Sequence, residues 1–387
     1  MPGKVTAFAS QIQESGPGSP WDYLAKNGAD RLQIILENTP GSINPIHYQW
    51  MKSHYPNTKL CLRLMLGRDE GSQLAYLGWS DDPLNRLSAK LAAVRLYDAT
   101  ALCHQKVGGL FDEFQATNEM AELRYGEFGW ARRDMVLWYS AMQAEWGRLI
   151  KEQLGKTPWY INHPRGCPAG LASFPYESDP DKWDELYRME LTLFDEALHS
   201  CNQYRGYWIH HNYADSADVT NDMKWFISRP VEIAYKQARI LDPRLKSILI
   251  GCGEGYIDVV DGQSKHHGWR DFKSAPAHAQ DFLTIENRFR HPDARQVVFS
   301  TGWGAHMYGS WPSFDYIGNG EQAFFNVVNQ VRNMPAPEAP LPYDPEPVPP
   351  MDQIELWLKD LWNREGVGWY PNNGFCMYVL DQARSNH

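Results

Sequence analysis

Short apolar runs recur along the chain, and longer stretches between them carry apolar residues at helical spacing. Eight runs predict β-strands: 5–10, 32–36, 60–66, 109–117, 159–162, 207–210, 247–250 and 296–300. Four stretches between them predict amphipathic helices: 82–105, 132–154, 180–201 and 230–240. Strands that alternate with helices in this way predict an α/β fold, a (β/α)8 TIM barrel.

A doubly wound open sheet is the alternative architecture for the same alternation. Such a sheet usually carries a glycine-rich phosphate loop after its first strand. Here that position is occupied by residues 13–20, Gln-Glu-Ser-Gly-Pro-Gly-Ser-Pro. Prolines at these positions do not suit a helix N-terminus that binds phosphate, so the barrel is favoured.

The C-terminal part of the chain differs in composition from the rest. We expect residues 1–333 to form the catalytic barrel, followed by a proline-rich extended segment at 334–351. Residues 352–387 are too few for a core of their own. The sequence from Ile354 to Trp362 reads as an amphipathic helix, and we expect this tail to pack on the barrel.

Charge and composition narrow the range of partners. The net charge is −10, from 37 basic and 47 acidic residues, without any Lys/Arg-rich block. Nucleic acid and anionic membranes are therefore not expected as partners. The 16 Trp and 20 Tyr residues favour a carbohydrate cleft, because aromatic faces stack on sugar rings, although large cores also bury such residues. Nothing in the sequence indicates an oligomeric state.

Cysteine spacing and the N-terminus bear on the compartment. None of the six cysteines forms a C-x-x-C pair, so we expect no zinc ribbon and mostly buried free thiols. The first residues lack an apolar signal core, and no run reaches the roughly 18–20 apolar residues of a membrane span. We expect a cytoplasmic protein, or a secreted one from which a signal peptide has been removed.

Candidate catalytic groups follow from the predicted barrel, because barrel enzymes place them at the C-terminal ends of strands. Glu119 follows the fourth predicted strand and Glu254 follows the seventh. These strands lie on opposite sides of an eight-stranded barrel, so two inward glutamates can meet over its axis. Two carboxyl groups about 5–5.5 Å apart are what a retaining glycoside hydrolase requires.

Further residues at strand ends complete a recognisable pattern. Asn118 precedes Glu119, His211-Asn-Tyr213 follows the sixth strand, Trp303 follows the eighth, and Arg63 lies on the third. In this order and placement, the pattern resembles clan A of the glycoside hydrolases. Two departures are Met120, where proline is common, and the glycine-rich surroundings of Glu254 in place of Thr-Glu.

The resemblance implies a retaining hydrolase that cleaves β-linked oligo- or polysaccharides by double displacement. It implies Glu119 as the general acid/base and Glu254 as the nucleophile. Asn118, His211, Tyr213, Trp303 and Arg63 are implied to bind substrate or to orient the two glutamates. Neither a metal nor an organic cofactor is implied.

Simpler interpretations of the same residues stay open. Glu119 could cap a helix, Glu254 could stabilise a glycine-rich turn, and Asp112 and Glu113 could pair with Arg or Lys inside the barrel. A sugar-binding barrel without catalysis is one alternative function. A metal-dependent barrel hydrolase is another, for which histidines are available at 163, 210, 211, 266 and 267. The predicted first strand has no histidine, which disfavours metal, and the polar segment 261–270 could be a substrate lid or a solvated loop.

Overall fold

The computed structural model describes residues 3–37, 42–67, 70–118, 133–163, 191–214, 216–219, 229–263, 265–306, 312–318 and 320–343. The chain divides into two compact units, Met1–Tyr343 and Asp344–His387. The expectation that the tail forms a helix on the barrel lies outside the described residues, as do Cys167 and Cys376.

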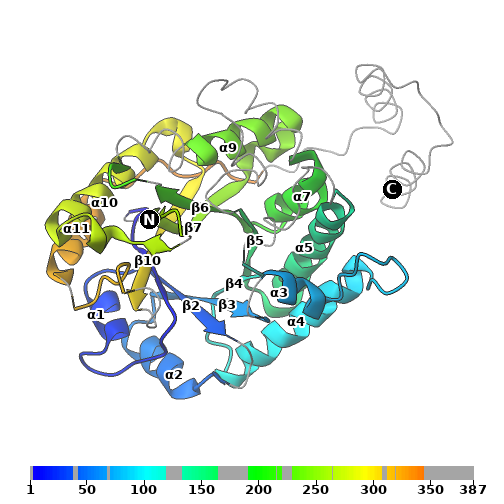
Figure 1. Ribbon diagram of the computed structural model, residues 1–387, viewed down its shortest axis with the longest axis horizontal. Helices are drawn as coiled ribbons and strands as arrows, with labels where there is room; N and C mark the ends of the chain where they lie inside the picture. The colour runs from blue at the N-terminus through cyan, green and yellow to red at the C-terminus, as the bar shows by residue number, and fades with distance from the viewer. Residues whose placement is uncertain are drawn as a thin grey trace. The chain divides into compact units, whose positions relative to one another are not determined.

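The first unit contains a closed barrel of eight parallel strands (Figure 1). Around the barrel the strands follow the order of the chain, and the last pairs with the first: β1 (Ala7–Ser10), β2 (Arg31–Glu37), β3 (Lys59–Met65), β4 (Glu113–Gln115), β5 (Thr157–His163), β6 (Tyr207–Ala214), β7 (Leu249–Ile257) and β10 (Val297–His306). The prediction of a (β/α)8 barrel is confirmed, and each of the eight predicted runs overlaps one of these strands.

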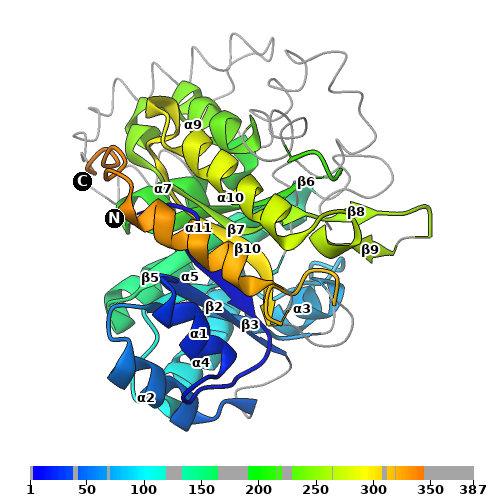
Figure 2. The ribbon, with the colours of Figure 1, turned by 90° about the vertical axis from the view of Figure 1, so that its left-hand side faces the viewer.

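Helices cover the outside of the barrel (Figures 1 and 2). They are α1 (Pro20–Lys26), α2 (Pro45–His54), α3 (Glu70–Leu77), α4 (Ala89–Lys106), α5 (Arg133–Leu154), α7 (Asp195–Gln203), α9 (Arg229–Leu241), α10 (Ala275–Phe289) and α11 (Glu321–Asn333). Local sequence sets several of their starts: Ser19, Asn44 and Ser88 cap α1, α2 and α4 by accepting a backbone N–H. Proline in the first turn of α1 and α2 loses no intrahelical bond.

Three strands extend by four or more residues past the C-terminal ends of their apolar runs. Strand β6 continues to Ala214, β7 to Ile257 and β10 to His306. The added residues are held by ladder pairing, for example between Tyr213 and Tyr256. Glu254 therefore lies within a strand and not in a turn after it. Strand β4 is shorter than predicted and ends at Gln115.

Apolar side chains form separate clusters on the two faces of the sheet. The largest joins the outer faces of the strands to the helices and includes Leu32, Tyr160 and Phe282. A second contains only strand residues, and its Trp159 on β5 and Phe299 on β10 have ring centroids 4.7 Å apart. Because β5 and β10 are not neighbours in the barrel, this contact crosses the barrel interior. The interior is thus a packed core.

A small hairpin and an extended segment complete the described structure. Strands β8 (Val259–Val260) and β9 (His266–His267) form an antiparallel pair after β7 (Figure 2). Residues 334–343 run along the barrel, where Arg295 binds the carbonyl of Ala339 at 2.7 Å and Gln296 accepts the N–H of Leu341 at 2.6 Å. The first part of the proline-rich segment is therefore attached to the barrel.

Two further expectations concern cysteines and membranes. The four cysteines in the described residues, Cys61, Cys103, Cys201 and Cys252, are buried free thiols, as expected. Among the helices that the structure describes, none has the length and apolar character needed to cross a bilayer.

Candidate active site

Strand β7 contains an irregularity directly before Glu254. His210 on β6 pairs with Cys252, but the next residue, His211, pairs with Glu254, so Gly253 is an extra residue on β7. Such a bulge changes which side chains point to a given face of the sheet. The glycine-rich sequence around Glu254, which departs from the usual clan A pattern, is the signal of this bulge.

Three side chains surround the carboxylate of Glu254. A guanidinium nitrogen of Arg63 donates to Oε1, and the hydroxyl of Tyr213 donates to Oε2 at 2.6 Å. Nδ1 of His211 lies 3.2 Å from Oε2. A cation and hydrogen-bond donors at both oxygens stabilise the negative charge of the carboxylate. Glu254 is buried, with 4% of its surface exposed, and Arg63 is 2% exposed.

The contact between Arg63 and Glu254 spans the barrel. Arg63 belongs to β3 and Glu254 to β7, and three strands separate β3 from β7 in either direction around the closed sheet. Both side chains therefore point inward. Tyr213 also contacts a small apolar cluster with Ala9, Ile35 and Phe314, and Phe314 comes from the loop after β10. This packing restrains the phenol ring beside Glu254.

The structure thus brings together four of the residues that the sequence singled out: Arg63, His211, Tyr213 and Glu254. Asn118 lies after β4, and its backbone N–H donates to Oε1 of Gln73 on α3 at 3.4 Å. Trp303 lies within β10, and its side chain is outside the described part.

Glu119 lies outside the described residues. If strand alternation continued to position 119, it would place Glu119 on the same side as Glu113, Gln115 and Thr117. Strand β4 ends at Gln115, and the hydroxyl of Thr117 lies 2.6 Å from that of Tyr139 on α5. Among the described residues, regular strand structure in β4 therefore ends at Gln115.

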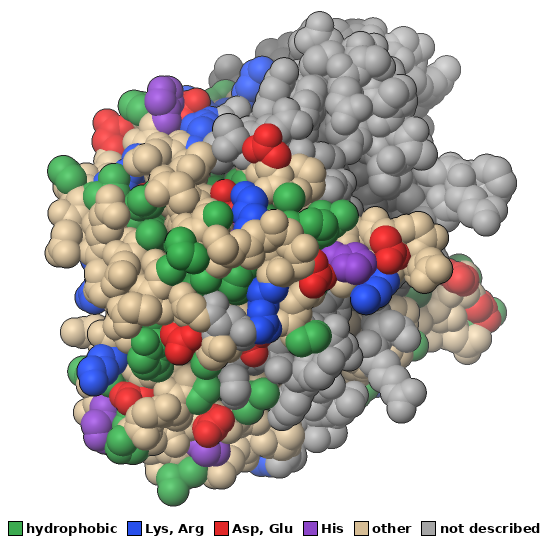
Figure 3. Space-filling model, turned by 60° about the vertical axis from the view of Figure 1, so that its left-hand side comes forward, with side chains coloured by type: hydrophobic (Ala, Val, Ile, Leu, Met, Phe, Trp, Pro, Cys, Tyr) green, Lys and Arg blue, Asp and Glu red, His purple; other side chains and the backbone are tan. Residues whose placement is uncertain are grey.

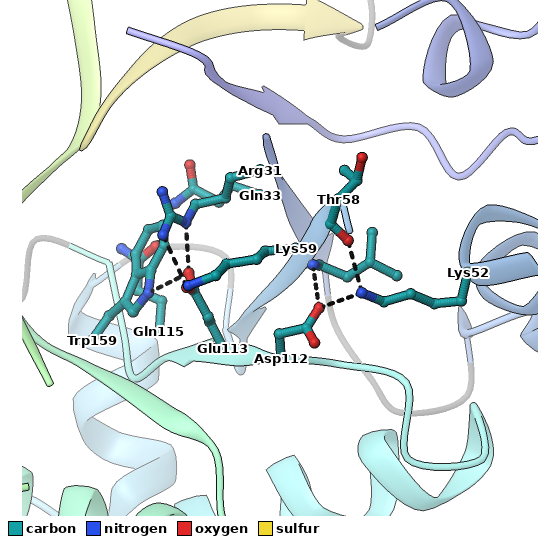
Figure 4. Close-up of polar contacts among 10 residues, drawn as sticks. Arg31, Gln33, Lys52, Thr58, Lys59, Asp112, Glu113, Gln115 and Trp159 are labelled. Atoms are coloured by element: carbon teal, nitrogen blue, oxygen red, sulfur yellow. Dashed lines mark hydrogen bonds and ion pairs between the residues drawn. The ribbon is translucent and has the colours of Figure 1, made fainter. Parts of the chain in front are cut away.

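The interpretation of Glu113 as an ion-pair partner inside the barrel is confirmed, whereas Asp112 pairs with Lys52 of the outer helix α2 (Figure 4). Arg31 and Lys59 converge on the carboxylate of Glu113, at 2.6 and 3.0 Å, and the indole of Trp159 donates to it at 3.0 Å. Lys52 binds Asp112 at 2.7 Å. Burial works to raise the pKa of Glu113, but the charge and hydrogen bonds of Arg31 and then of Lys59 outweigh it and lower the pKa to about 2. Arg31, Lys59 and Glu113 are the first residues of strands β2, β3 and β4. The cluster therefore lies at the N-terminal end of the barrel, away from Glu254.

The polar segment 261–270 forms much of the β8–β9 hairpin and its continuation. Nδ1 of His266 lies 2.8 Å from Asp258, and His267 lies between Asp261 at 3.1 Å and Asp271 at 2.8 Å. The carboxylate of Asp261 also accepts the backbone N–H groups of Gln263 and Lys265. The part of the chain that the structure describes contains no group of three His, Cys, Asp or Glu residues arranged to hold a metal ion.

Sequence reasoning missed two features near the site. One is the bulge in β7, for which Gly251-Cys-Gly-Glu-Gly was an available signal. The other is the attachment of the loop after β7 to the loop after β10. Gly268 donates to the hydroxyl of Ser313 at 2.9 Å, and the indole of Trp269 donates to the carbonyl of Phe314 at 3.0 Å. No local pattern predicts contacts between residues about 45 positions apart.

Comparisons with known proteins support the fold. No family model matches the chain, and no curated protein sequence matches it significantly. The catalytic domain of a GH26 endo-β-1,4-mannanase from Bacillus sp. JAMB-750 aligns over 85% of this chain and 85% of its own, with 11% identity and a TM-score of 0.50. A family 5 xyloglucanase from Paenibacillus pabuli aligns over 86% of this chain and 98% of its own, with 11% identity and a TM-score of 0.47. A fungal β-1,4-galactanase aligns over 84% of this chain and 99% of its own, with 12% identity and a TM-score of 0.47. The chain is therefore similar in fold to barrel enzymes of the clan that its sequence pattern resembles.

Proposed function

We propose that this protein is a retaining glycoside hydrolase that cleaves β-linked oligo- or polysaccharides. Glu254 is the nucleophile that attacks the anomeric carbon and forms a glycosyl-enzyme intermediate. Glu119 first protonates the leaving oxygen and then deprotonates the water that releases the sugar. Arg63, His211 and Tyr213 hold Glu254, while Asn118 and Trp303 bind the sugar.

One observation carries this proposal: the buried carboxylate of Glu254 is held inside the barrel by Arg63, Tyr213 and His211. A nucleophile needs a charged carboxylate in a fixed direction, and these three contacts supply both. The assignment of Glu119 is supported by the sequence pattern alone. The GH26 mannanase has the same fold and acts on a β-1,4-linked polymer, so β-1,4-mannan is the first substrate to test.

Replacement of Glu254 by glycine tests the nucleophile. Activity on 2,4-dinitrophenyl β-glycosides should fall by at least about 10³-fold, because the covalent intermediate cannot form. Added azide should restore turnover and give the α-glycosyl azide, since azide fills the space of the carboxylate and attacks from its side. The product is identified by NMR.

Replacement of Glu119 by alanine tests the acid/base. Loss of general acid–base catalysis should cost about 10²–10⁴-fold with poor leaving groups and much less with dinitrophenol. Azide should here give the β-glycosyl azide, because it attacks the intermediate from the opposite face. The two variants therefore yield opposite anomers.

Asp261→Asn is the matched control, since Asp261 is a competing carboxylate after the same strand. It should retain activity and show no rescue by azide. If both Glu254→Gly and Glu119→Ala hydrolyse the glycosides at the wild-type rate, the two-glutamate mechanism is wrong. Loss of wild-type activity on treatment with EDTA would favour the metal-dependent alternative.

A further inference from the structure

Helix α4 carries an exposed stripe of four residues on its outer side: Leu91, Arg95, Asp98 and Leu102. Their spacing of four, three and four residues places them on one face of the helix. Leu91 is 57% exposed and Leu102 is 45% exposed. Isolated exposed leucines are common, but here two lie on one line with a charged pair between them.

The stripe borders a groove of about 510 Å³. Tyr76 of α3, Leu87 and Val94 line it together with the four stripe residues. Tyr76 and Val94 are themselves 44% and 37% exposed, so the apolar surface extends beyond the two leucines. Contiguous exposed apolar surface beside a concave site is typical of an interaction surface.

The stripe is complementary to a second copy of itself that runs antiparallel, because leucine then meets leucine and opposite charges meet. Leucine, arginine, aspartate and leucine pair with leucine, aspartate, arginine and leucine when a second copy runs antiparallel. A two-fold axis midway between Leu96 and Tyr97 would place Leu91 against Leu102 of the second copy. The same axis would place Arg95 against Asp98 of the second copy. A two-fold interface requires this self-complementarity, whereas a foreign partner does not.

The side chains of Arg95 and Asp98 are available for contacts with a second copy. Among the described residues, Asp98 makes no hydrogen bond or ion pair, although Arg95 lies only one turn away on the same helix. Nη1 of Arg95 donates to the carbonyl of Tyr76 at 2.6 Å, which orients the guanidinium beside the groove. Each guanidinium has further N–H donors for a carboxylate.

We propose that the protein forms a homodimer in which α4 of one copy packs antiparallel on α4 of the other. Leu102 of each copy enters the groove beside Leu91 of its partner, and two ion pairs between Arg95 and Asp98 set the register. Helix α4 lies on the outer wall of the barrel (Figure 1), so the dimer requires none of the residues around Glu254.

Sedimentation velocity of the full chain tests this proposal over about a hundredfold range of concentration. The wild type should sediment with twice the 44.5 kDa mass of the chain and dissociate on dilution. Arg95→Asp or Asp98→Arg alone should each weaken the dimer by at least about tenfold, because like charges then face one another at both symmetric contacts.

Two combinations should restore the dimer. The double variant R95D/D98R recovers complementary charges within each interface. An equimolar mixture of the R95D and D98R chains should form a heterodimer, since the acidic face of one then meets the basic face of the other. Restoration by mixing follows from the proposed contact between position 95 of one copy and position 98 of the other.

Leu102→Glu provides an independent disruption. Ile46→Glu is its control, because Ile46 is 62% exposed on another helix, α2, and does not line the groove. Leu102→Glu should be monomeric with unchanged circular dichroism and glycosidase rate, and Ile46→Glu should remain dimeric. A wild type that is monomeric at every concentration would overturn the proposal. So would a dimer that both single charge reversals leave intact.

Discussion

Two buried tyrosines occupy paired positions on β6 and β7, but only one contacts the candidate nucleophile. Tyr213 donates to Glu254 at 2.6 Å, whereas Tyr256 turns to the outer face and stacks on Phe282 with centroids 4.4 Å apart. The backbone of Tyr256 has φ of 91°, which non-glycine residues rarely adopt and which costs on the order of 1–3 kcal/mol. After the bulge, Glu254 therefore points into the barrel and Tyr256 packs on its outer face.

Tyr213→Phe should reduce kcat by about 10- to 100-fold with little change in KM, because one hydrogen bond to a charged carboxylate is lost. Steady-state kinetics on the best aryl β-glycoside measure the effect. Tyr256→Phe is the matched control, and its kcat should change by less than about twofold. An equal loss of kcat in the two variants would mean that the hydroxyl of Tyr213 contributes to the stability of the barrel and not to the orientation of Glu254.

At the other end of the barrel, Glu113 shows what an inward carboxylate does when cations surround it. Its two cationic partners and the indole of Trp159 satisfy both oxygens. Removing one member of a buried ion pair costs about 3–5 kcal/mol, since the other charge stays buried. We therefore assign Glu113 to stability and not to catalysis.

Glu113→Gln should lower the free energy of unfolding at pH 7 by about 3–5 kcal/mol. The pKa of Glu113 is about 2 in the folded protein, against 4.5 for an unperturbed glutamate. Its contribution is therefore complete above pH 4.5 and is lost as the pH falls toward 2. The difference between variant and wild type should shrink over that range in urea denaturation. Glu145→Gln, which breaks a more exposed pair with Arg148, should change stability by less than about 1 kcal/mol.

At the scale of elements, the β8–β9 hairpin has only two residues in each strand. Backbone hydrogen bonds between strands this short would not stabilise the hairpin by themselves. Side chains compensate: His267 bridges Asp261 and Asp271, and both of its ring nitrogens face carboxylates. Only the doubly protonated ring can donate to both. The bond to Asp261 and then that to Asp271 raise the pKa of His267 above 6.5.

An NMR titration of the His267 ring should therefore give a pKa above 6.5. The stabilisation by the charged ring is present below pH 6.5 and is lost as the pH rises through the folded pKa. Asp271→Asn should lower the pKa of His267, and added salt should lower it as well, because the hairpin is exposed. A pKa that is unchanged in Asp271→Asn would show that this contact does not hold in solution.

At the scale of the whole molecule, the barrel closes within Met1–Tyr343. The backbone of residues 335–343 forms hydrogen bonds with the side chains of Arg290, Arg295 and Gln296. On the face that Figure 3 shows, acidic, basic and hydrophobic side chains of the described residues are interspersed.

A chain that ends at Tyr343 should keep a single cooperative unfolding transition, because every strand of the barrel is retained. A chain that ends at Met334 should melt several degrees lower, since the partners of three barrel side chains are removed. Differential scanning calorimetry compares the two. Aggregation of the Tyr343 truncation would contradict an independent barrel and favour the expectation that the tail packs on it.

The fold class and the order of the strands could be predicted from the amino-acid sequence alone. Strands and amphipathic helices are indicated by the spacing of apolar residues. This spacing is a local property that the amino-acid sequence shows directly. The same alternation placed Glu254, His211 and Tyr213 near strand ends and Arg63 on the third strand. It also indicated that Glu113 could pair with a cation.

The contacts that those residues make depend on the folded barrel. Arg63 and Glu254 are separated by 191 positions, and only closure of the barrel brings them into contact. Strands β6 and β7 continue past their apolar runs because ladder bonds to neighbouring strands stabilise polar and glycine residues there. The bulge at Gly253 and the left-handed backbone of Tyr256 then direct one carboxylate inward and one phenol outward. These outcomes depend on contacts between distant segments, whose free energy no local pattern contains.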